Sequence, residues 1–479
     1  MRVLLTHPYL LALDPREAAL VRPYPPLGTL QVAANLRAAG HDVVFVDPMF
    51  ETDARSFARA LDEGPWDLVA VVPDDHSVQI KQCLSRTRDI GLEMCALAKK
   101  RGITVVVSGP DASDHPAVYQ QAGADAVFRG EVAEALVEWT LPENRPISGV
   151  VGLGGAGDGR RAVIRDLDAM PDPDWSLCDL NAYAQRWRRR HGQWELNIWT
   201  ARGCPYRCNW CAKPVWGRSY HVRSAERVAA EILALCDQGG PDRLWFTDDI
   251  FALRSDWLKA YRRAMGARTL PFRCLSRADL LCDDEYVGDL AAAGCDEVWI
   301  GAESGSDKVL RAMDKDCSVD QIRTARRLAR KHGIRIGFFL QLGYPGEALE
   351  DVRATVRLVD ELRPDLIGVS VSYPMPGTKF FERVADSMGQ MNWSASMDNL
   401  TLFDAPYDQS FYDAAKQVLR STHSAGRARA SLRALLTAPS RHNARKAAGA
   451  VYHRLRLPLA RARMHRLAIP NAAAVPLTW

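Results

Sequence analysis

The sequence predicts an α/β protein with a doubly wound parallel sheet, a partial (β/α)6 barrel after it, and a helical basic tail. Three observations lead to this fold class. The chain has 479 residues, which exceeds the length that a single hydrophobic core usually supports. Short apolar runs alternate with helical stretches in two successive blocks. The last part carries basic residues and no acidic ones. We therefore expect a sheet domain at 1–140, a linker at 141–195, a barrel at 196–385 and a helical extension at 386–479.

Five apolar runs in the first block predict a parallel sheet with helices on both faces. The strands are expected at 2–6, 41–46, 66–72, 103–108 and 126–128, with helices at 27–39 and 93–101 among them. Such sheets bind ligands where their strands end. Here those ends carry His7-Pro8, Asp47-Pro48, Pro73-Asp74-Asp75-His76 and Gly109-Pro110-Asp111.

The second block repeats strand and helix six times, which predicts a parallel barrel with its functional groups at the C-terminal ends of the strands. The strands are expected at 196–200, 243–247, 272–276, 297–301, 335–340 and 366–372. The helices are expected at 225–237, 255–267, 283–293, 319–332 and 347–362. A glycine-rich stretch at 152–159 and a proline-rich stretch at 170–175 separate the two blocks.

The composition is that of an ordinary globular protein. Hydrophobic residues make up 47% and charged residues 25%, which excludes a disordered or collagen-like chain. No apolar run approaches the roughly 18 residues that a membrane helix needs. Polar residues interrupt the N-terminal apolar stretch, which does not fit a signal peptide. The sequence therefore predicts a cytoplasmic protein without an integral membrane segment, in which the 11 cysteines are thiols or metal ligands.

The net charge of +4 hides an asymmetry. Residues 421–479 contain 11 Lys and Arg and no Asp or Glu, which leaves 51 basic against 58 acidic residues in the rest. A basic amphipathic helix here would suit an anionic membrane surface or a nucleic acid. The simpler interpretation is a solvated helix packed on the acidic body. Pro458 is expected to break any continuous helix in this region.

Three cysteines stand close together directly after the first barrel strand. Cys204, Cys208 and Cys211 fall within eight residues, and thiolates select zinc, copper(I) or iron–sulfur clusters. Structural zinc takes four protein ligands, but no fourth cysteine or close histidine completes such a set here, since His221 lies ten residues beyond Cys211. A cubane cluster held by three cysteines keeps one iron open for an amine and a carboxylate. The alternative is three buried thiols without a metal.

This loop resembles that of the radical S-adenosylmethionine (SAM) superfamily, in the subgroup with a cobalamin-binding domain. The resemblance rests on C-x-x-x-C-x-x-C after the first strand of a six-unit barrel, with an aromatic residue before the third cysteine. It implies that Cys204, Cys208 and Cys211 are catalytic and hold a [4Fe–4S] cluster whose open iron binds SAM. The SAM contacts that it implies are Tyr206, Trp210, Asp248, Asp249, Ser276, Arg277, Glu303 and Gly343.

The first block resembles the Rossmann-like cobalamin (B12)-binding domain that precedes the barrel in this subgroup. The matching stretches are 24–28, 38–43, 108–110 and 129–131. The lower-ligand motif D-x-H-x-x-G is absent after the first strand, and Asp111 stands where relatives commonly have His. A sheet domain that binds no corrinoid stays open as an alternative. The cobalamin contacts that the resemblance implies are His7, Pro26, Gly28, Asp74, Gly109, Pro110, Gly130 and Glu131.

The resemblance implies an enzyme that cleaves SAM to a 5′-deoxyadenosyl radical and methylates an unactivated carbon of a small molecule through methylcobalamin. It also implies an external electron donor of the flavodoxin or ferredoxin type. The alternatives are a radical cyclase, dehydratase or oxidoreductase without methyl transfer, an RNA-modifying enzyme, and a noncatalytic cluster- or corrinoid-binding regulator. A second cluster is a further alternative to simple core packing for four other thiols: Cys274, Cys282, Cys295 and Cys317.

Overall fold

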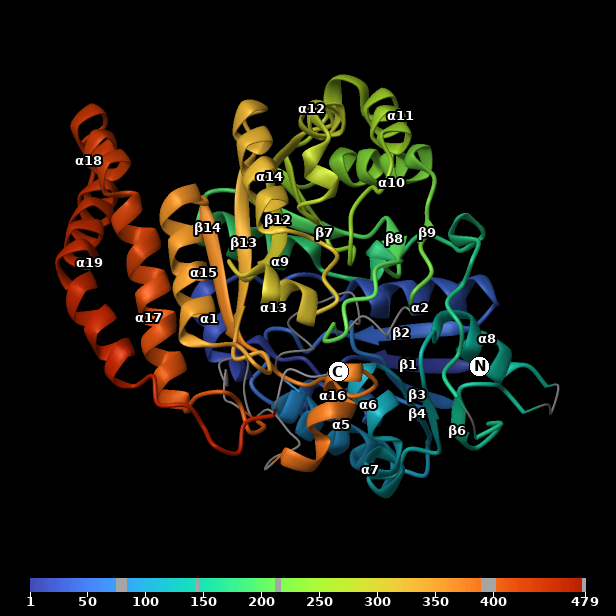
Figure 1. Ribbon diagram of the computed structural model, residues 1–479. Helices are drawn as coiled ribbons and strands as arrows, with labels where there is room; N and C mark the ends of the chain where they lie inside the picture. Colours follow the sequence, from blue (N-terminus) through green and yellow to red (C-terminus); the bar gives the residue numbers. More distant parts are fainter. Residues whose placement is uncertain (75–83, 143–145, 158, 212–216, 389–401, 476–479) are drawn as a thin grey trace.

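The computed structural model describes residues 1–479 apart from 75–83, 143–145, 158, 212–216, 389–401 and 476–479. In the described residues, a mainly parallel sheet is followed along the chain by an all-parallel sheet, and a group of helices lies beside the second sheet (Figure 1). The predicted α/β fold class is confirmed.

The first sheet has the strand order β2-β1-β3-β4-β5-β6. Its parallel strands are β1 (Arg2–Thr6), β2 (Asp42–Val46), β3 (Leu68–Val71), β4 (Thr104–Val107) and β5 (Ala126–Phe128). The order reverses between β1 and β3, and doubly wound sheets bind ligands at such a switch point. An antiparallel strand, β6 (Val150–Gly152), pairs with β5 inside the range expected as a linker. Its glycine-rich surroundings gave no apolar pattern to predict it.

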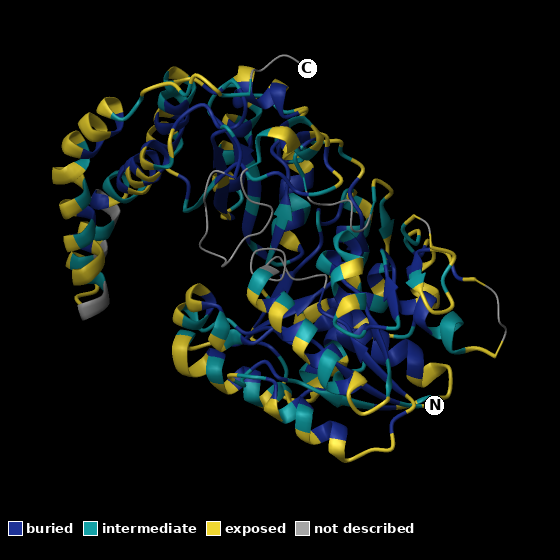
Figure 2. Cartoon of the chain, turned by 90° about the horizontal axis from the view of Figure 1, so that it is seen from below, coloured by how far each residue is buried: buried dark blue, intermediate teal, exposed yellow. Residues whose placement is uncertain are grey.

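Helices cover both faces of this sheet. α2 (Leu27–Ala38) and α8 (Ala133–Thr140) pack on one face, and α3 (Arg55–Asp62) and α5 (Leu84–Lys99) on the other. The shorter helices are η1 (Leu11–Leu13), α1 (Pro15–Leu20), α6 (Pro110–Asp114) and α7 (Pro116–Gln121). The strands are largely buried (Figure 2), as expected for a parallel sheet covered on both sides.

The second sheet has the strand order β14-β13-β12-β11-β10-β7, with every pair parallel. The strands are β7 (Glu195–Ile198), β10 (Arg243–Phe246), β11 (Phe272–Ser276), β12 (Cys295–Glu303), β13 (Arg335–Leu342) and β14 (Leu366–Val371). Because the terminal strands β7 and β14 are not neighbours in this order, the barrel is open, as predicted.

The barrel helices lie on the outer side of this sheet (Figure 1). They are α10 (Ala225–Asp237), α11 (Ser255–Met265), α12 (Asp284–Ala292), α13 (Asp307–Ala312), α14 (Val319–Lys331) and α15 (Leu349–Leu362), with short turns η5 (Gly266–Arg268) and η6 (Leu280–Cys282). The segment that joins the two sheets contains η2 (Leu167–Ala169), η3 (Trp175–Leu177) and α9 (Leu180–His191).

The segment before α2 inserts into the N-terminal end of the barrel. The hydroxyl of Tyr24 donates to Glu195 Oε1 at 2.5 Å and accepts from Arg273 Nη2 at 2.6 Å. Asn197 Nδ2 donates to the carbonyl oxygen of Pro25 at 3.0 Å. These buried contacts hold the two domains against each other.

The C-terminal part is helical, with α16 (Lys379–Val384), η7 (Ala385–Ser387), α17 (Gln409–Gly426), α18 (Ala428–Thr437) and α19 (Arg441–Arg466). α17 packs against α15 and β14, and α19 packs against α17. The expectation that Pro458 breaks the helix is wrong, because α19 continues through it. Proline removes one backbone hydrogen bond, but buried residues such as Ala460 and Met464 hold α19 in the core. Among the described residues, no helix combines the length and the hydropathy that a transmembrane segment needs.

Candidate functional site

The cysteine loop lies at the C-terminal end of the barrel strands, where parallel barrels gather their functional groups. It follows β7 and is framed by an antiparallel ribbon of β8 (Ala201–Arg202) and β9 (His221–Val222). Cys204 is buried, and Cys208 and Cys211 are half-buried.

Asn209 fixes this loop between two of the cysteines. Its Nδ2 donates to the carbonyl of Ala312 at 2.8 Å and to Asp314 Oδ2 at 3.2 Å. Its Oδ1 accepts from the hydroxyl of Tyr344 at 2.7 Å. The loop is thereby tied to the C-terminal end of α13 (Asp307–Ala312) and to the turn after β13. Sequence reasoning missed Asn209, because a single Asn in a loop has no diagnostic spacing.

Arg277, directly after β11, lies against the cysteine loop. Its guanidinium lies 3.6 Å from the centre of the Tyr206 ring, and Nη1 donates to Cys208 Sγ at 3.7 Å. Nε donates to Asp279 Oδ1 at 2.8 Å, which fixes the side chain. Arg277 therefore places a positive charge beside the sulfur of Cys208.

Glu303 and Lys315 form a buried ion pair next to the loop. Lys315 Nζ lies 3.0 Å from Glu303 Oε1, and the two side chains are 8% and 4% exposed. Lys315 Nζ is also 5.9 Å from the centre of the Trp210 ring. Glu303 has a φ of 53°, a left-handed conformation that is costly for a non-glycine residue. Lys315 was not predicted, since it lies in a loop twelve residues beyond its partner.

Asp248 connects the end of β10 to the start of the cysteine loop. Its Oδ1 accepts from the backbone N–H groups of Thr200 at 2.7 Å and Ala201 at 2.9 Å, and its Oδ2 accepts from the Thr200 hydroxyl. Burial raises the pKa of Asp248 to about 7, against the effect of these hydrogen bonds. Asp249 is half-buried beside it, and Ser276 is buried at the end of β11.

Gly343 occupies the turn after β13 with a φ of 78°. Its N–H donates to Glu347 Oε2 at 2.6 Å, and a Cβ at this position would lie 3.0 Å from the Tyr412 ring. Glu347 is 2% exposed, and burial raises its pKa to about 8. The second oxygen of this carboxyl group, Oε1, is buried and has no hydrogen-bond partner among the described residues, which costs a protonated carboxyl group less than a carboxylate.

Glu347→Gln is expected to flatten the pH dependence of stability. In the unfolded chain the carboxyl group of residue 347 loses its proton near its ordinary pKa of 4.5, whereas in the native protein it keeps the proton up to a pH of about 8. The free energy of unfolding therefore falls as the pH rises through this window. The amide does not titrate and should lose less stability. Urea unfolding at several pH values across the window tests this. The exposed Glu350→Gln is the control, and an equal pH slope in all three proteins contradicts the assignment.

The donor set of the cysteine loop fits an iron–sulfur cluster. Three thiols lie on one loop beside the cations Arg277 and Lys315, in surroundings that suit a thiolate-held metal centre. No three His, Cys, Asp or Glu side chains of the described residues converge on one metal position, so the fit rests on the donors and their neighbours. Within the described part of the chain, the four cysteines considered for a second cluster do not converge on one metal position either.

Five of the residues predicted to contact cobalamin lie at the C-terminal ends of β3 and β4 and the start of α2. Gly28 donates its N–H to Asp74 Oδ1 at 2.9 Å, and Pro26 directly precedes α2. Gly109 has a φ of 105°, and Pro110 begins α6. The structure thus brings these residues to the edge of the sheet at which such domains bind ligands.

His7, at the end of β1, is already engaged within the domain. Its Nε2 lies 2.9 Å from Asp47 Oδ1, and its Nδ1 accepts from the N–H of Tyr9 at 3.3 Å. Tyr183 donates to the other oxygen of Asp47 at 2.6 Å. Both ring nitrogens are therefore occupied, and His7 fixes the ends of β1 and β2.

Glu131 points to the barrel domain and meets Arg202 in a buried ion pair. Arg202 Nη1 contacts Glu131 Oε2, and both side chains are 2% exposed. Glu131 Oε1 also accepts from the N–H of Ala133 at 3.3 Å, and the neighbouring Gly130 has a φ of 88°. Arg202 stands two residues before Cys204, so this pair links the sheet domain to the base of the cysteine loop.

Asp111, which stands where relatives commonly have a histidine, is bound by side chains of its own domain. Arg88 Nε donates to Asp111 Oδ2 at 2.8 Å, and the Tyr119 hydroxyl donates to the same oxygen at 2.8 Å. These residues line a small pocket at the ends of β3 and β4. Asp75 and His76, which follow the third strand expected from the sequence, lie outside the described residues.

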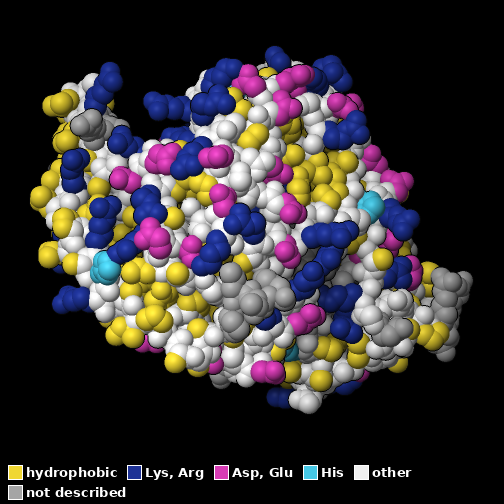
Figure 3. Space-filling model, in the orientation of Figure 1, with side chains coloured by type: hydrophobic (Ala, Val, Ile, Leu, Met, Phe, Trp, Pro, Cys, Tyr) yellow, Lys and Arg dark blue, Asp and Glu magenta, His cyan; other side chains and the backbone are white. Residues whose placement is uncertain are grey.

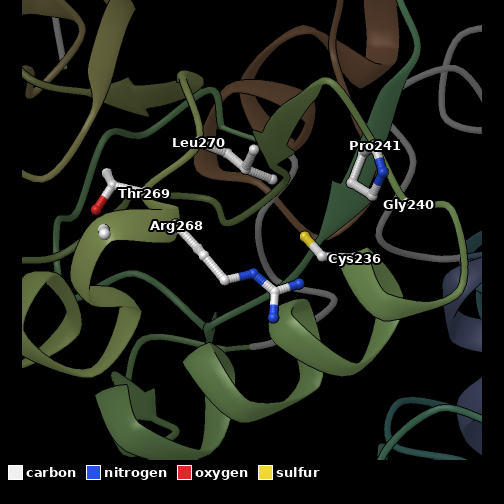
Figure 4. Close-up of a pocket in the computed structure, with 7 residues that line it drawn as sticks. Cys236, Gly240, Pro241, Arg268, Thr269 and Leu270 are labelled. Atoms are coloured by element: carbon white, nitrogen blue, oxygen red, sulfur yellow. The ribbon is translucent and has the colours of Figure 1, made fainter.

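A shallow pocket at the opposite end of the barrel has no part in this site (Figure 4). It lies between the end of α10 and the segments that precede β10 and β11, with Cys236, Pro241 and Leu270 in its wall. The guanidinium of Arg268 is already paired with Asp237 at 2.8 Å.

An aromatic pair on β12 and β13 was not predicted. The rings of Trp299 and Phe339 stack with centres 4.6 Å apart, and Phe339 is 41% exposed. A Cβ on Gly337 would lie 2.4 Å from Trp299, and one on Gly368 would lie 3.1 Å from Phe339. The two glycines therefore make room for the stack. Both residues lie within the predicted strands 297–301 and 335–340, and nothing in their spacing marks them as a pair.

Two family models match the chain. Residues 200–359 match the radical SAM superfamily, and residues 18–139 match the B12 binding domain. An uncharacterized methyltransferase of Pyrococcus horikoshii is 26% identical over 80% of this chain and 85% of its own. The anaerobic magnesium-protoporphyrin IX monomethyl ester cyclase of Cereibacter sphaeroides is 24% identical over 82% of this chain and 65% of its own.

A similar fold is found in a solved structure. The radical SAM methyltransferase TsrM from Kitasatospora setae, with cobalamin and a [4Fe–4S] cluster bound, has a TM-score of 0.65 at 21% identity. The similarity covers 81% of this chain and 78% of TsrM. This chain therefore carries a B12-binding domain followed by a radical SAM domain, in the order that the structure shows.

Proposed function

We propose that this chain is a B12-dependent radical SAM enzyme that methylates an unactivated carbon of a small molecule. The buried Arg202–Glu131 pair carries the proposal, because it holds the cysteine loop against the ligand-binding edge of the sheet domain. Groups bound by the domain at 1–140 and by the barrel at 196–385 would then face a common space. The relatives named as methyltransferases support this activity.

In this proposal Cys204, Cys208 and Cys211 hold a [4Fe–4S] cluster. When bound, the cluster supplies the electron that cleaves SAM, and cobalamin carries the methyl group. Arg277 lies against Cys208 and offsets the negative charge of the thiolate. Asp248 positions the start of the loop. The SAM contacts expected from the sequence remain candidates, and Lys315 is added to them.

Cobalamin would lie along the C-terminal edge of the first sheet, near Gly28, Asp74 and Gly109. His7 and Glu131 act through the positions of neighbouring groups, because their polar atoms already have partners. The exposed ring of Phe339 offers the substrate an apolar surface inside the barrel. We further propose a flavodoxin- or ferredoxin-type electron donor and a cytoplasmic location.

Anaerobic reconstitution of the full chain with iron, sulfide and cobalamin tests the proposal. We expect a reducible iron–sulfur spectrum, a bound corrinoid and 5′-deoxyadenosine after reduction with SAM. With methyl-deuterated SAM and a cell extract, the label should appear in one small-molecule product. Failure to form 5′-deoxyadenosine contradicts radical SAM activity. If 5′-deoxyadenosine forms but no corrinoid binds and no label is transferred, a cyclase-type reaction without methyl transfer replaces the proposal.

A further inference from the structure

The outer face of the C-terminal helices carries a continuous apolar stripe. On α19, Val451 is 40% exposed, Tyr452 51%, Leu455 74% and Leu459 70%. Val451, Leu455 and Leu459 follow one another at intervals of four residues, and Tyr452 precedes Leu455 by three, so these side chains lie on one face of the helix. The residues of α19 buried against the rest of the protein lie on the opposite face, among them Ala450 and Met464, which are 5% and 3% exposed.

Exposed arginines border this stripe on both sides. Arg454 and Arg461 are seven residues apart along one margin, and Arg456 and Arg463 along the other. In the part of the chain that the structure describes, none of the four forms an ion pair with an Asp or Glu side chain. α19 packs on the body through its apolar face, and these four arginines remain solvated.

The neighbouring helix α18 extends the same surface. Leu436 is 83% exposed and Leu432, one turn earlier, is 42% exposed. Figure 3 shows hydrophobic side chains interspersed with Lys and Arg along the edge of the molecule that α18 and α19 form. Together with the lack of any Asp or Glu in 421–479, this surface combines exposed leucines with unbalanced positive charge.

We propose that α18 and α19 form a docking surface for an anionic phospholipid membrane. The leucine stripe would enter the boundary between headgroups and acyl chains, and the flanking arginines would contact lipid phosphates. An RNA partner would use the arginines but leave the leucines in water, and a second copy of the chain would bring like charges together. The membrane is the occupant that uses both features. This inference does not depend on the catalytic assignment.

Vesicle co-sedimentation of the full-length protein tests the proposal. We expect binding to vesicles of phosphatidylcholine with phosphatidylglycerol, and at least about tenfold weaker binding to phosphatidylcholine alone. Leu455→Glu with Leu459→Glu should reduce binding to the anionic vesicles by at least about tenfold. Leu153→Glu, a substitution at a 57% exposed leucine of the first domain, is the matched control and should bind like the parent.

The other occupants give distinct results. The thermal unfolding temperature of the double variant should equal that of the parent, since both leucines are exposed. Equal binding to neutral and anionic vesicles overturns the proposal, as does unchanged binding by the double variant. Absence of vesicle binding also overturns the proposal. In that case, a dimer seen by light scattering that the double variant loses would assign the surface to a second copy of the chain. A gel shift with RNA that the double variant retains would assign it to RNA.

Discussion

Cys208→Ala is expected to abolish SAM cleavage. Cys208 is the loop thiol that Arg277 contacts, and its loss leaves two thiols for a cluster that needs three. Substitution of an indirect partner of a metal ligand already costs about 10–100-fold in metal affinity or activity. We therefore expect a loss of more than about 100-fold in 5′-deoxyadenosine formation, with iron and sulfide content falling in parallel.

Two further variants show whether the effect is specific. Cys236→Ala removes a half-buried thiol from α10, at the opposite end of the barrel, and should keep full iron content and activity. Arg277→Met leaves all three thiols in place but removes the adjacent cation. It should weaken cluster binding by about 10–100-fold. Full iron content and SAM cleavage in Cys208→Ala would exclude the cysteine loop as the cluster site.

Arg202→Met is expected to lower the free energy of unfolding by about 3–5 kcal/mol. Arg202 and Glu131 are each 2% exposed and lie on different domains. Removing the cation leaves a buried carboxylate without its ionic partner, and this penalty exceeds the attraction that is lost. Urea unfolding monitored by tryptophan fluorescence measures the change.

A double-mutant cycle with Glu131→Gln isolates the pair. The double variant should recover part of the loss, because no uncompensated charge then remains buried. The exposed pair Arg254–Asp256, with side chains 80% and 74% exposed, supplies the control. Arg254→Met should cost less than about 1 kcal/mol. An equal cost for Arg202→Met would show that the interdomain pair is not important for stability.

Much of the fold could be predicted from local patterns. The strands of both sheets appear at the expected places, and β1, β5 and β11 have the expected bounds. Buried parallel strands leave a strong signal, since both faces are apolar. β6 was missed because it is a short antiparallel edge strand in a glycine-rich stretch. Pro458 was misjudged because packing of α19 outweighs the local preference.

The candidate site was predictable only where the signal is local. The cysteine loop is recognisable from spacing alone, because its three thiols are neighbours in sequence. The sequence did not indicate Lys315, Asn209 or Phe339, because the contact that makes each of them relevant is with a residue distant in sequence. For His7 and Glu131 the chain alone could not show that partners already occupy their polar atoms.

The sequence by itself determined the two-domain α/β fold, the cysteine loop and the basic character of the tail, since these follow from residue type and spacing. Only the tertiary structure decided which charges meet across the domains and which face of α19 remains exposed. The physical reason is that burial and ion pairing depend on contacts between distant segments. Arginine is a solvated charge at the exposed positions of α19, whereas at position 202 it is buried and links the two domains.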